Sequence, residues 1–496
     1  MFRSVKQNKP ATSSKLPGLS SEALASSSLT SRGYGIVKNS LRPEQLEAVR
    51  AFCTVQAAAP PVGPPHPRFA VFRESQSKIY LPKHLGLRTY GEPAEARLPP
   101  GRPLDAAAAA FSGSMREEQA GPVGAYLAAA RDPLRRGGVI NMGCGNGKTV
   151  MALHIVAQLR KRTMVIVHKE FLMNQWRERI EQFLPGASIG RVQGPALDAD
   201  KDVVLVMLQT LASREFPPGA LDGFGLVVVD ECHHCSAEVF SRALHKINFE
   251  HSLGLSATVQ RKDGLGRVFQ WFLGEVVVVS GRGGQAATNA QKGGAVDPMF
   301  DTQARVLPFV CSDPKYREES FIGGVKINMA RMVSNVCAYA PRTAFLVDAL
   351  LAAAAERPTR TLVLSERRNH LVDIHRLLNA RAPDVTVGYY VGGMREAQLK
   401  QAESCDVILG TFSMAAEGMD IPALDTLVLA SPKSDIEQSV GRVLRVRPSE
   451  RVCAPRIIDI VDGFSVFDAQ ARKRQRFYKQ RGFVFVSQKP SPVPSA

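Results

Sequence analysis

The sequence is poor in cysteine and has no long apolar run. Its 496 residues include eight cysteines scattered between Cys53 and Cys453, which is too sparse for a disulfide scaffold and is typical of a reducing compartment. No apolar run reaches the length of a membrane-spanning helix, and no secretory signal is evident. We therefore expect an intracellular protein that makes no membrane contact.

Acidic residues are few relative to basic ones. The chain has 46 Asp and Glu against 63 Lys and Arg, which gives a formal net charge of +17. This excess favours a polyanionic partner, nucleic acid before all others, although arginine-rich compositions also occur in GC-rich genomes without any binding role. The length exceeds what one core can fill, so we expect two to four domains.

Metal-ligating clusters are sparse as well. Cys232-His-His-Cys235 has the spacing of half a zinc site, but no second pair at ligand spacing lies nearby. The carboxylates that precede it account for the segment better, so we expect no zinc site.

The first 110 residues show no regular pattern. Residues 1–33 are rich in Ser, Lys and Ala, with no acidic residue before Glu22, which favours a disordered tail over a mitochondrial transit peptide. Residues 34–110 contain short strand-like runs at 69–72 and 78–81 between Pro-rich loops. We predict a small mixed accessory domain here, whose role the sequence does not indicate.

Beyond this region, apolar β-rich runs alternate with helical patterns, which indicates parallel sheets covered on both faces. The first series of runs defines a domain over 111–280, with strands predicted at 139–142, 164–167, 203–207, 226–230 and 252–255. A glycine-rich stretch then begins a flexible insertion and linker over 281–345. The second series defines a domain over 346–470, with strands predicted at 361–364, 385–391, 407–409, 426–429 and 456–460, and a basic tail follows over 471–496. The fold class is therefore α/β, with two parallel-sheet domains in tandem.

A glycine-rich loop joins the first of these strands to an apolar helix. Glycines let backbone N–H groups approach phosphate oxygens, and the helix N-terminus adds partial positive charge. Lys148 is placed to reach the β- and γ-phosphates of ATP, and Thr149 to bind Mg²⁺. The strict pattern has glycine where Met142 stands, yet the rest of the loop is in place: Gly143, Cys144, Gly145, Asn146, Gly147, Lys148 and Thr149.

Two carboxylates end a buried strand downstream. Asp230, at the strand tip, suits the coordination of Mg²⁺, and Glu231 can orient or deprotonate the attacking water. Solvated acids at a strand end are the common alternative. The phosphate loop about 80 residues upstream favours the nucleotide site.

An arginine pair lies near the end of the second domain. Arg442 and Arg445 fall on one face of a predicted helix that Gln438 begins. An arginine supplied by a second domain can neutralise transition-state charge in phosphoryl transfer, whereas the alternative is a solvated basic helix. Because the motifs occur as an ordered set, we interpret Arg442 and Arg445 as catalytic together with Lys148, Asp230 and Glu231.

Taken together, these motifs resemble those of superfamily 2 helicases and translocases over roughly 111–460. The resemblance is strongest to the XPB-like branch and to the helicases of nucleocytoplasmic large DNA viruses. Segments at 115–119, 167–176, 254–264, 365–368 and 418–422 also carry it. The resemblance implies two RecA-like domains that use ATP and Mg²⁺ to move along nucleic acid.

The resemblance also implies roles for individual positions. Gln119, together with Arg116, would recognise adenine, whereas the similar signal ending at Gln45 lies too far from the loop. Ser256 and Thr258 would couple hydrolysis to domain motion. The second domain would contact the nucleotide through Gly418, Asp420 and Gln438.

Nucleic acid would cross both domains at small and polar groups, which contact phosphate and sugar rather than base edges. Read singly, each of these residues is equally well a loop or capping residue. They are His168, Lys169, Gln209, Thr210, Arg367, Gly392, Gly393 and Thr411.

Two departures and the basic tail limit the interpretation. Val259 replaces the proline usual after Ser-Ala-Thr, and Cys232 differs from the commonest acidic-motif variants, so DNA and RNA both stay open.

In the tail, residues 472–481 include six basic side chains, which could follow a phosphate backbone or serve as a nuclear-localisation signal. The spacing of Phe464, Phe467, Phe477 and Tyr478 favours a helix packed on the second domain over base stacking.

We therefore predict an ATP-dependent helicase or translocase, with duplex DNA as the better match to the XPB-like features. An RNA helicase and a non-unwinding remodeller that displaces proteins or polymerase from DNA are the alternatives. Transcription or replication proteins are candidate partners. The nucleus or cytoplasm of an infected host cell is the expected location if the chain is viral, and mitochondria are less favoured.

Overall fold

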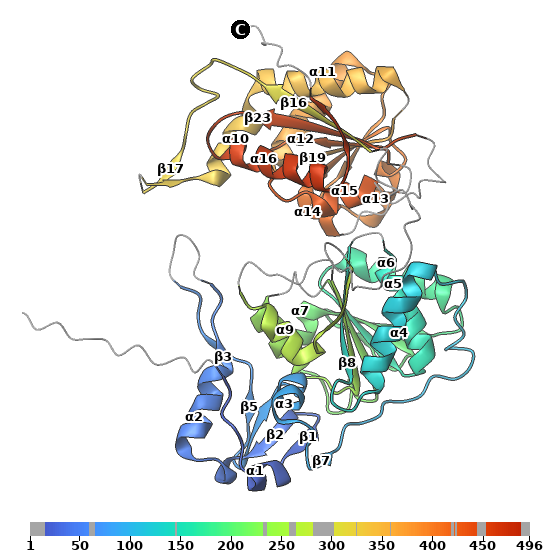
Figure 1. The fold of residues 1–496 in the computed structure, drawn as a ribbon. Helices are drawn as coiled ribbons and strands as arrows, with labels where there is room; N and C mark the ends of the chain where they lie inside the picture. Colours follow the sequence, from blue (N-terminus) through green and yellow to red (C-terminus); the bar gives the residue numbers. More distant parts are fainter. Residues whose placement is uncertain are drawn as a thin grey trace, which may run out of the picture. The chain divides into compact units, whose positions relative to one another are not determined.

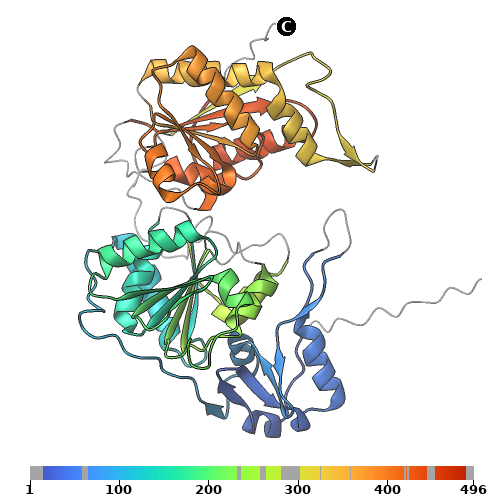
Figure 2. The same ribbon diagram turned by 180° about the vertical axis from the view of Figure 1, so that it is seen from behind.

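A computed structural model describes residues 15–58, 65–143, 146–231, 236–256, 264–280, 302–323, 325–357, 359–417, 421, 424–443 and 453–487 (Figure 1). The chain divides into two compact units, residues 1–286 and 287–496, which we describe separately. Each unit is built around a parallel β-sheet flanked by helices, as Figure 2 shows from behind. The predicted α/β class with two tandem parallel-sheet domains is confirmed.

The accessory region forms a five-stranded sheet with the order β5-β6-β2-β1-β7. Its strands are β1 (Ser28–Thr30), β2 (Gly33–Val37), β5 (Arg73–Glu74), β6 (Lys78–Leu81) and β7 (Glu95–Ala96), and its helices are α1 (Ser21–Ala25), α2 (Pro43–Phe52) and α3 (Lys83–Tyr90). A separate short ladder pairs β3 (Thr54–Val55) with β4 (Phe69–Ala70). The prediction of a disordered tail up to residue 33 is wrong for residues 21–33, because α1 and β1 are integral to this region.

The accessory region packs onto the first parallel-sheet domain through α3. The Lys83 Nζ donates to the carbonyl of Glu250 (3.0 Å), and His84 Nε2 lies 2.8 Å from Ser252 Oγ. Both side chains are buried, and burial lowers the pKa of each below its ordinary value. One apolar core then runs from the accessory strands to α9 (Gly266–Leu273), so the two parts form one unit.

The first parallel sheet has the order β11-β10-β12-β9-β13-β14-β8-β15. Strands appear where we predicted them: β8 (Gly137–Met142), β9 (Thr163–Val167), β12 (Val203–Met207), β13 (Leu226–Asp230) and β14 (His251–Ser256). We did not predict three further strands: the edge strands β11 (Ala196–Asp198) and β15 (Val276–Ser280), and β10 (Ile189–Gln193), which lies between β11 and β12.

Helices cover both faces of this sheet, as the continuous apolar strands require. One face packs against α4 (Glu117–Arg131), α5 (Lys148–Leu159) and α6 (Glu170–Phe183). The other face packs against α7 (Leu208–Ser213), α8 (Ala237–Leu244) and α9. On α6, the side chains of Leu172, Trp176 and Ile180 are buried on the face that packs against the sheet, and Phe183 packs beside them half-buried.

The second unit holds a seven-stranded sheet with the order β20-β21-β19-β22-β23-β16-β24. Its strands are β16 (Gln303–Phe309), β19 (Thr361–Ser365), β20 (Val387–Tyr390), β21 (Val407–Thr411), β22 (Thr426–Leu429), β23 (Arg456–Asp462) and β24 (Val484–Ser487). Helices α10 (Met329–Ala338), α11 (Ala340–Glu356) and α12 (Arg368–Arg381) pack on one face. The shorter helices α13 (Glu396–Ala402), α14 (Phe412–Glu417) and α15 (Glu437–Val443) complete the unit with α16 (Ser465–Gln480).

The predicted basic tail is part of this second unit. Helix α16 packs on the sheet and β24 pairs with β16, so the unit extends past the boundary that we placed at residue 470 and begins before the one at 346. Phe467 and Tyr478 are buried, and the Tyr478 hydroxyl donates to Asp459 Oδ2 (3.0 Å). The packed-helix interpretation is therefore confirmed for these aromatics, and base stacking by Tyr478 is excluded.

Among the described residues, no single helix is both long and apolar enough to cross a membrane. Helices α10 and α11 meet that requirement only as a pair bent by 67°, and both are packed against the second sheet.

Candidate nucleotide-binding site

The phosphate loop leads from β8 into α5. Gly147 caps α5 with a φ of +70°, a left-handed conformation that glycine adopts without strain. The Lys148 Nζ donates to the carbonyl of Met142 (3.0 Å) and lies 3.4 Å from Glu231 Oε1. Lysine and glutamate are thus paired across the strand ends where the sequence predicted the nucleotide.

The acidic pair stands at the carboxyl end of β13. In the sheet, β14 separates β13 from β8, so Asp230, the buried Ser256 and the phosphate loop follow one another along a single edge. Glu231 has a φ of +47°, which is uncommon for a residue with a Cβ and typically costs about 1–3 kcal/mol. Such strain is often found at functional sites, where surrounding contacts hold the residue in place.

Asp230 is held by a tryptophan. The indole Nε1 of Trp176 donates to Asp230 Oδ2 (2.9 Å), and both side chains are buried. Burial, followed by repulsion from Glu231, raises the pKa of Asp230 from 3.8 to about 6, while the Trp176 hydrogen bond and Lys148 act in the opposite direction. A buried carboxylate beside a second acid is suited to a divalent cation, because the cation offsets both charges.

Trp176 is a site residue that sequence reasoning missed. In the sequence it falls within the segment 167–176 that carries the family resemblance, and no individual role was assigned to it. A buried indole N–H needs an acceptor, and that requirement was the signal in the sequence that could have pointed to a polar partner.

Gln119 lies against the phosphate loop. It is buried in the first turn of α4, where its Oε1 accepts from the Arg116 backbone N–H (3.0 Å) and its Nε2 donates to the carbonyl of Asn146 (3.1 Å). A Cβ on Gly147 would lie 2.2 Å from Gln119 Nε2, so glycine also permits this close approach. The structure therefore brings Gln119 to the loop, whereas Gln45 binds the carbonyl of Gly18 (2.9 Å).

The predicted nucleic-acid contacts of the first unit follow neighbouring strands. His168 comes directly after β9, and Gln209, in the first turn of α7 after β12, donates through Nε2 to the His168 carbonyl (2.9 Å). Thr210 Oγ1 accepts from the Gly194 backbone N–H (2.9 Å). Because β9 is also next to β13, these residues continue the same sheet edge beyond Asp230. Lys169 caps α6 at this edge.

In the second unit, the predicted contacts also share one edge. Arg367, Gly392 and Thr411 lie at or just after the ends of β19, β20 and β21, which are neighbours in the sheet. The Arg368 guanidinium donates to the Gly392 carbonyl, and Gly393 has a φ of +87°. Thr411 Oγ1 lies 3.2 Å from Ser413 Oγ.

Several predicted site residues lie outside the described residues. They are Cys144, Gly145, Thr258, Gly418, Asp420 and Arg445, together with the side chain of Arg442, whose backbone is in α15 with Gln438. The candidate half zinc site at 232–235 also lies outside them. Among the residues that are described, no group of three or more His, Cys, Asp or Glu side chains could hold a metal ion.

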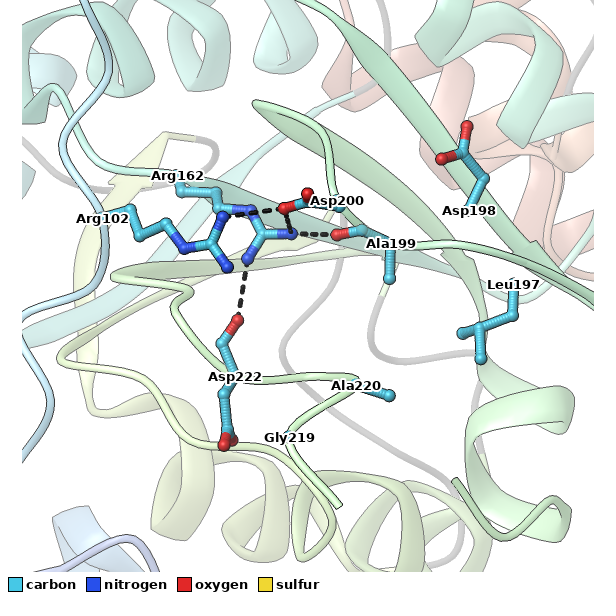
Figure 3. A pocket seen from close by; sticks show the side chains of 9 residues that line it. All are labelled: Arg102, Arg162, Leu197, Asp198, Ala199, Asp200, Gly219, Ala220 and Asp222. Carbon is cyan, nitrogen blue, oxygen red and sulfur yellow. Dashed lines mark hydrogen bonds and ion pairs between the residues drawn. The ribbon is translucent and has the colours of Figure 1, made fainter. Parts of the chain in front are cut away.

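A cavity of about 310 Å³ lies at the opposite edge of the first sheet (Figure 3). The Arg162 guanidinium in it donates to the carbonyls of Lys201 (2.8 Å) and Asp222 (2.8 Å), and Arg102 pairs with Asp200 (2.7 Å). These residues precede the strands, whereas the nucleotide residues follow them. The arginines in this cavity therefore link neighbouring loops through hydrogen bonds and an ion pair, and the cavity is separate from the phosphate loop.

Comparison with known proteins agrees with this arrangement. Residues 112–261 match the family described as "Type III restriction enzyme, res subunit", and residues 342–447 match the "Helicase conserved C-terminal domain". A candidate ATP-dependent RNA helicase of Acanthamoeba polyphaga mimivirus is 28% identical over 92% of this chain and 85% of its own length. A similarly described protein of African swine fever virus is 25% identical over 69% of each chain.

The chain is a superfamily 2 helicase. It resembles the helicases of large DNA viruses, and it is a nucleic-acid-dependent ATPase, as the resemblance in the sequence implied. The crystal structure of UvsW from phage T4 covers 90% of the helicase and 96% of its own chain, at 16% identity and a TM-score of 0.34.

Proposed function

We propose that this helicase translocates on duplex DNA, and that the residues described above perform the steps of its ATPase cycle. The observation that carries the proposal is the continuity of one sheet edge. From β8 to β12, this edge holds the phosphate loop, Ser256, the acidic pair and then the polar residues His168 and Gln209. ATP hydrolysis and binding of the track, meaning the nucleic acid along which the helicase moves, would therefore occur on neighbouring strand ends.

Lys148 and Glu231 would exchange partners when ATP binds. Lys148 pairs with Glu231 at 3.4 Å, and both side chains are largely buried. The phosphates of ATP carry more negative charge than one carboxylate, so they would draw Lys148 towards the β- and γ-phosphates. Glu231 would then be available to orient the attacking water and accept its proton.

Asp230 and Thr149 would hold Mg²⁺, which supplies charge neutralisation at the phosphates. The donor set fits this ion, because carboxylate and hydroxyl oxygens are the ligands it prefers. Trp176 would fix the orientation of the Asp230 carboxylate through its 2.9 Å hydrogen bond. Gln119 would report adenine binding to the loop through the carbonyl of Asn146.

We assign the remaining roles on the basis of the motifs. Arg442 and Arg445 would stabilise the charge of the transferred phosphoryl group, and Gly418, Asp420 and Gln438 would contact the nucleotide. Ser256 and Thr258 would couple hydrolysis to motion. Arg367, Gly392, Gly393 and Thr411 would contact the track together with Lys169 and Thr210.

Two considerations bear on the identity of the track. The net charge of +17 suits any nucleic acid, and polar groups at strand ends suit sugar–phosphate contacts rather than base reading. The XPB-like motifs favour duplex DNA. The printed descriptions of the mimivirus and African swine fever virus proteins name RNA helicases, which makes RNA the second candidate. We place the activity inside the cell, in transcription, replication or repair of DNA.

Steady-state ATP hydrolysis by the full chain tests the proposal. The rate would be measured without nucleic acid and with single-stranded DNA, duplex DNA, single-stranded RNA and duplex RNA, with Glu231→Gln as the inactive control. We expect the strongest stimulation by duplex DNA. Preferential stimulation by either RNA would refute the DNA assignment. Whichever nucleic acid stimulates the wild type, the Glu231→Gln variant must show no stimulated ATP hydrolysis.

A further inference from the structure

Residues 430–436 join β22 to α15 and are held from two sides. The backbone N–H of Glu366, just after β19, donates to Ser431 Oγ (2.9 Å). The guanidinium of Arg474, buried in α16, donates to the Lys433 carbonyl (2.6 Å). The path of this segment, and with it the start of α15, is therefore set by residues that lie outside the segment.

The Lys433 side chain makes two further contacts, each with a residue that follows a strand. Its Nζ pairs with Glu366 Oε1 and lies 5.4 Å from the centre of the Phe412 ring, within the range of a cation–π interaction. Glu366 follows β19, and Phe412 begins α14 directly after β21. Because β19 and β21 are neighbours in the sheet, one lysine contacts the ends of two adjacent strands.

Both contacts lie one residue away from a proposed track contact. Arg367 follows Glu366, and Thr411 precedes Phe412. The Arg367 guanidinium donates to the carbonyls of Glu366 (3.1 Å) and Ala330 (2.7 Å). A phosphate is a stronger acceptor than a carbonyl because it is charged, so a track phosphate would draw this guanidinium away from both. Track binding would therefore change the hydrogen bonds that hold Glu366 in place.

On its other side, the connecting segment leads into the helix whose sequence includes Arg442. Figure 1 shows α14 and α15 next to each other in the second unit. Ile436 and Val440 are buried in the same core as Phe412. Packed interiors have few voids and transmit displacements. A shift of Lys433 would therefore reach α15 through both the backbone and this core.

From these contacts we propose that Lys433 is a positioning residue, which couples binding of the track to the placement of α15. Nucleic acid at the two track contacts would shift their neighbours, and Lys433 would follow both. Helix α15 would then hold Arg442 where it acts on the phosphoryl group. The inference rests on the proposed function, from which it takes the track contacts and the role of Arg442. It goes further by naming the residue through which nucleic acid accelerates hydrolysis.

Two simpler roles for this lysine predict different measurements. A lysine that contacts a track phosphate contributes to the affinity for nucleic acid and to its salt dependence. A lysine that only stabilises the fold lowers the unfolding temperature and reduces ATP hydrolysis with and without nucleic acid alike. A positioning residue instead changes the maximal stimulated rate and leaves the affinity and the basal rate in place.

The test uses full-length variants and whichever nucleic acid stimulates the wild type most. Lys433→Met keeps the length of the side chain and removes its charge, Lys433→Arg keeps the charge, and Glu366→Gln removes the charge of the partner. Lys400→Met is the matched control, because Lys400 on α13 forms an ion pair with Glu396 (3.4 Å) in the same unit. We would measure basal and stimulated ATP hydrolysis, the dissociation constant of the nucleic acid by fluorescence anisotropy, and the unfolding temperature.

We expect Lys433→Met to lower the maximal stimulated rate about tenfold, while the basal rate and the dissociation constant stay within about twofold of wild type and the unfolding temperature is unchanged. Glu366→Gln should act in the same direction. Combining the two should be no slower than Lys433→Met alone, because both remove one ion pair. Lys433→Arg and Lys400→Met should be stimulated as the wild type is.

Three results for Lys433→Met would overturn the inference. Weaker binding of nucleic acid with an unchanged maximal rate would make Lys433 a track contact. Equal losses of the basal and the stimulated rate would make its role structural. Full stimulation would leave it without a role in hydrolysis.

Two results for the wild type separate this inference from the proposed function. Stronger stimulation by RNA than by duplex DNA would refute the DNA assignment alone, and the same variants would then be compared on RNA. No stimulation by any nucleic acid would overturn both.

Discussion

The indole Nε1 of Trp176 donates a 2.9 Å hydrogen bond to the carboxylate of Asp230, and both side chains are buried. A helix that follows β9 thereby orients the acid at the end of β13. The contact links two motifs that lie 54 residues apart in the sequence. It also opposes the rise that burial and Glu231 cause in the pKa of the acid on which Mg²⁺ binding would depend.

Replacement of Trp176 by phenylalanine keeps most of the ring volume and removes the donor. A hydrogen bond to a charged group contributes about 1.5–3 kcal/mol, so we expect ATPase activity to fall about tenfold and the Mg²⁺ concentration for half-maximal activity to rise. A Mg²⁺ titration of the ATPase rate would measure both effects.

Trp271→Phe provides the matched control for lost packing. Trp271 is equally buried, in α9, where its ring packs 5.4 Å from that of Phe52. We expect this variant to lower the unfolding temperature without changing the Mg²⁺ requirement. An equal change in that requirement in both variants would show that the Trp176 hydrogen bond has no specific role.

The raised pKa of Asp230 predicts a pH-dependent stability. Burial raises its pKa from 3.8 to about 6, so between these values the folded protein holds a proton that the unfolded chain releases. The stabilisation from that proton is complete below pH 3.8 and is lost as the pH rises through about 6. Asp230→Asn should therefore be more stable than wild type near neutral pH by on the order of 2 kcal/mol, and no more stable at acidic pH.

Chemical denaturation of the wild type and of Asp230→Asn, without nucleotide or Mg²⁺, across this pH range would show which of the two is more stable at each pH. The asparagine variant should be inactive as an ATPase, since it lacks the charge for the metal. A wild-type protein that becomes more stable than Asp230→Asn as the pH rises through 6 would contradict the assigned environment.

Gln119 and Gln45 allow a comparison between two nearly identical local structures. Each is the third residue of a helix whose N-cap is an arginine, and each accepts from that arginine's backbone N–H at 3.0 Å. Only Gln119 donates to the phosphate loop, so Gln119→Ala should raise the KM for ATP about tenfold while Gln45→Ala leaves it unchanged. The KM for GTP should differ less between the wild type and Gln119→Ala than the KM for ATP does. Equal effects of the two alanine variants on the KM would refute an adenine-reporting role.

Much of the parallel-sheet architecture followed from the sequence, because strands buried on both faces leave continuous apolar runs. The strands over 203–207, 226–230 and 426–429 were predicted to the residue. Strand β10, next to the edge strand β11, was missed because its alternate residues, such as Arg191, are only partly buried and interrupt the apolar run. Strand β24 was missed because it follows the basic helix α16, and its place beside β16 depends on long-range pairing.

The candidate site was predictable to the extent that local motifs define it. The phosphate loop and the acidic pair come from contiguous residues, and the parallel sheet brings their strand ends together. The identity of the acceptor for the Trp176 indole and the loop contact of Gln119 were not predictable, because both depend on how helices pack across the sheet edge.

The docking of α3 predicts that the accessory region stabilises the motor domain. Lys83 and His84 bind the backbone of Glu250 and the side chain of Ser252 from buried positions. Lys83→Ala with His84→Ala should lower the free energy of unfolding of the first unit by about 2–4 kcal/mol. Arg88→Ala, on the same helix but in an exposed ion pair with Glu275 at 3.4 Å, should change it by less than about 1 kcal/mol.

Denaturant unfolding followed by limited proteolysis would distinguish a shared core from a tethered module. A shared core requires one cooperative transition that shifts as a whole in the double variant. Separate transitions, with that of the nucleotide-binding sheet unchanged, would contradict the single unit described here.

The central claim is that ATP hydrolysis at Glu231 drives movement along intact duplex DNA. Displacement of a triplex-forming third strand from a duplex tests it most directly, because the third strand can be removed without separating the other two. We predict displacement that requires ATP and is abolished in Glu231→Gln. A wild-type protein that hydrolyses ATP on duplex DNA yet leaves the third strand bound would contradict the account.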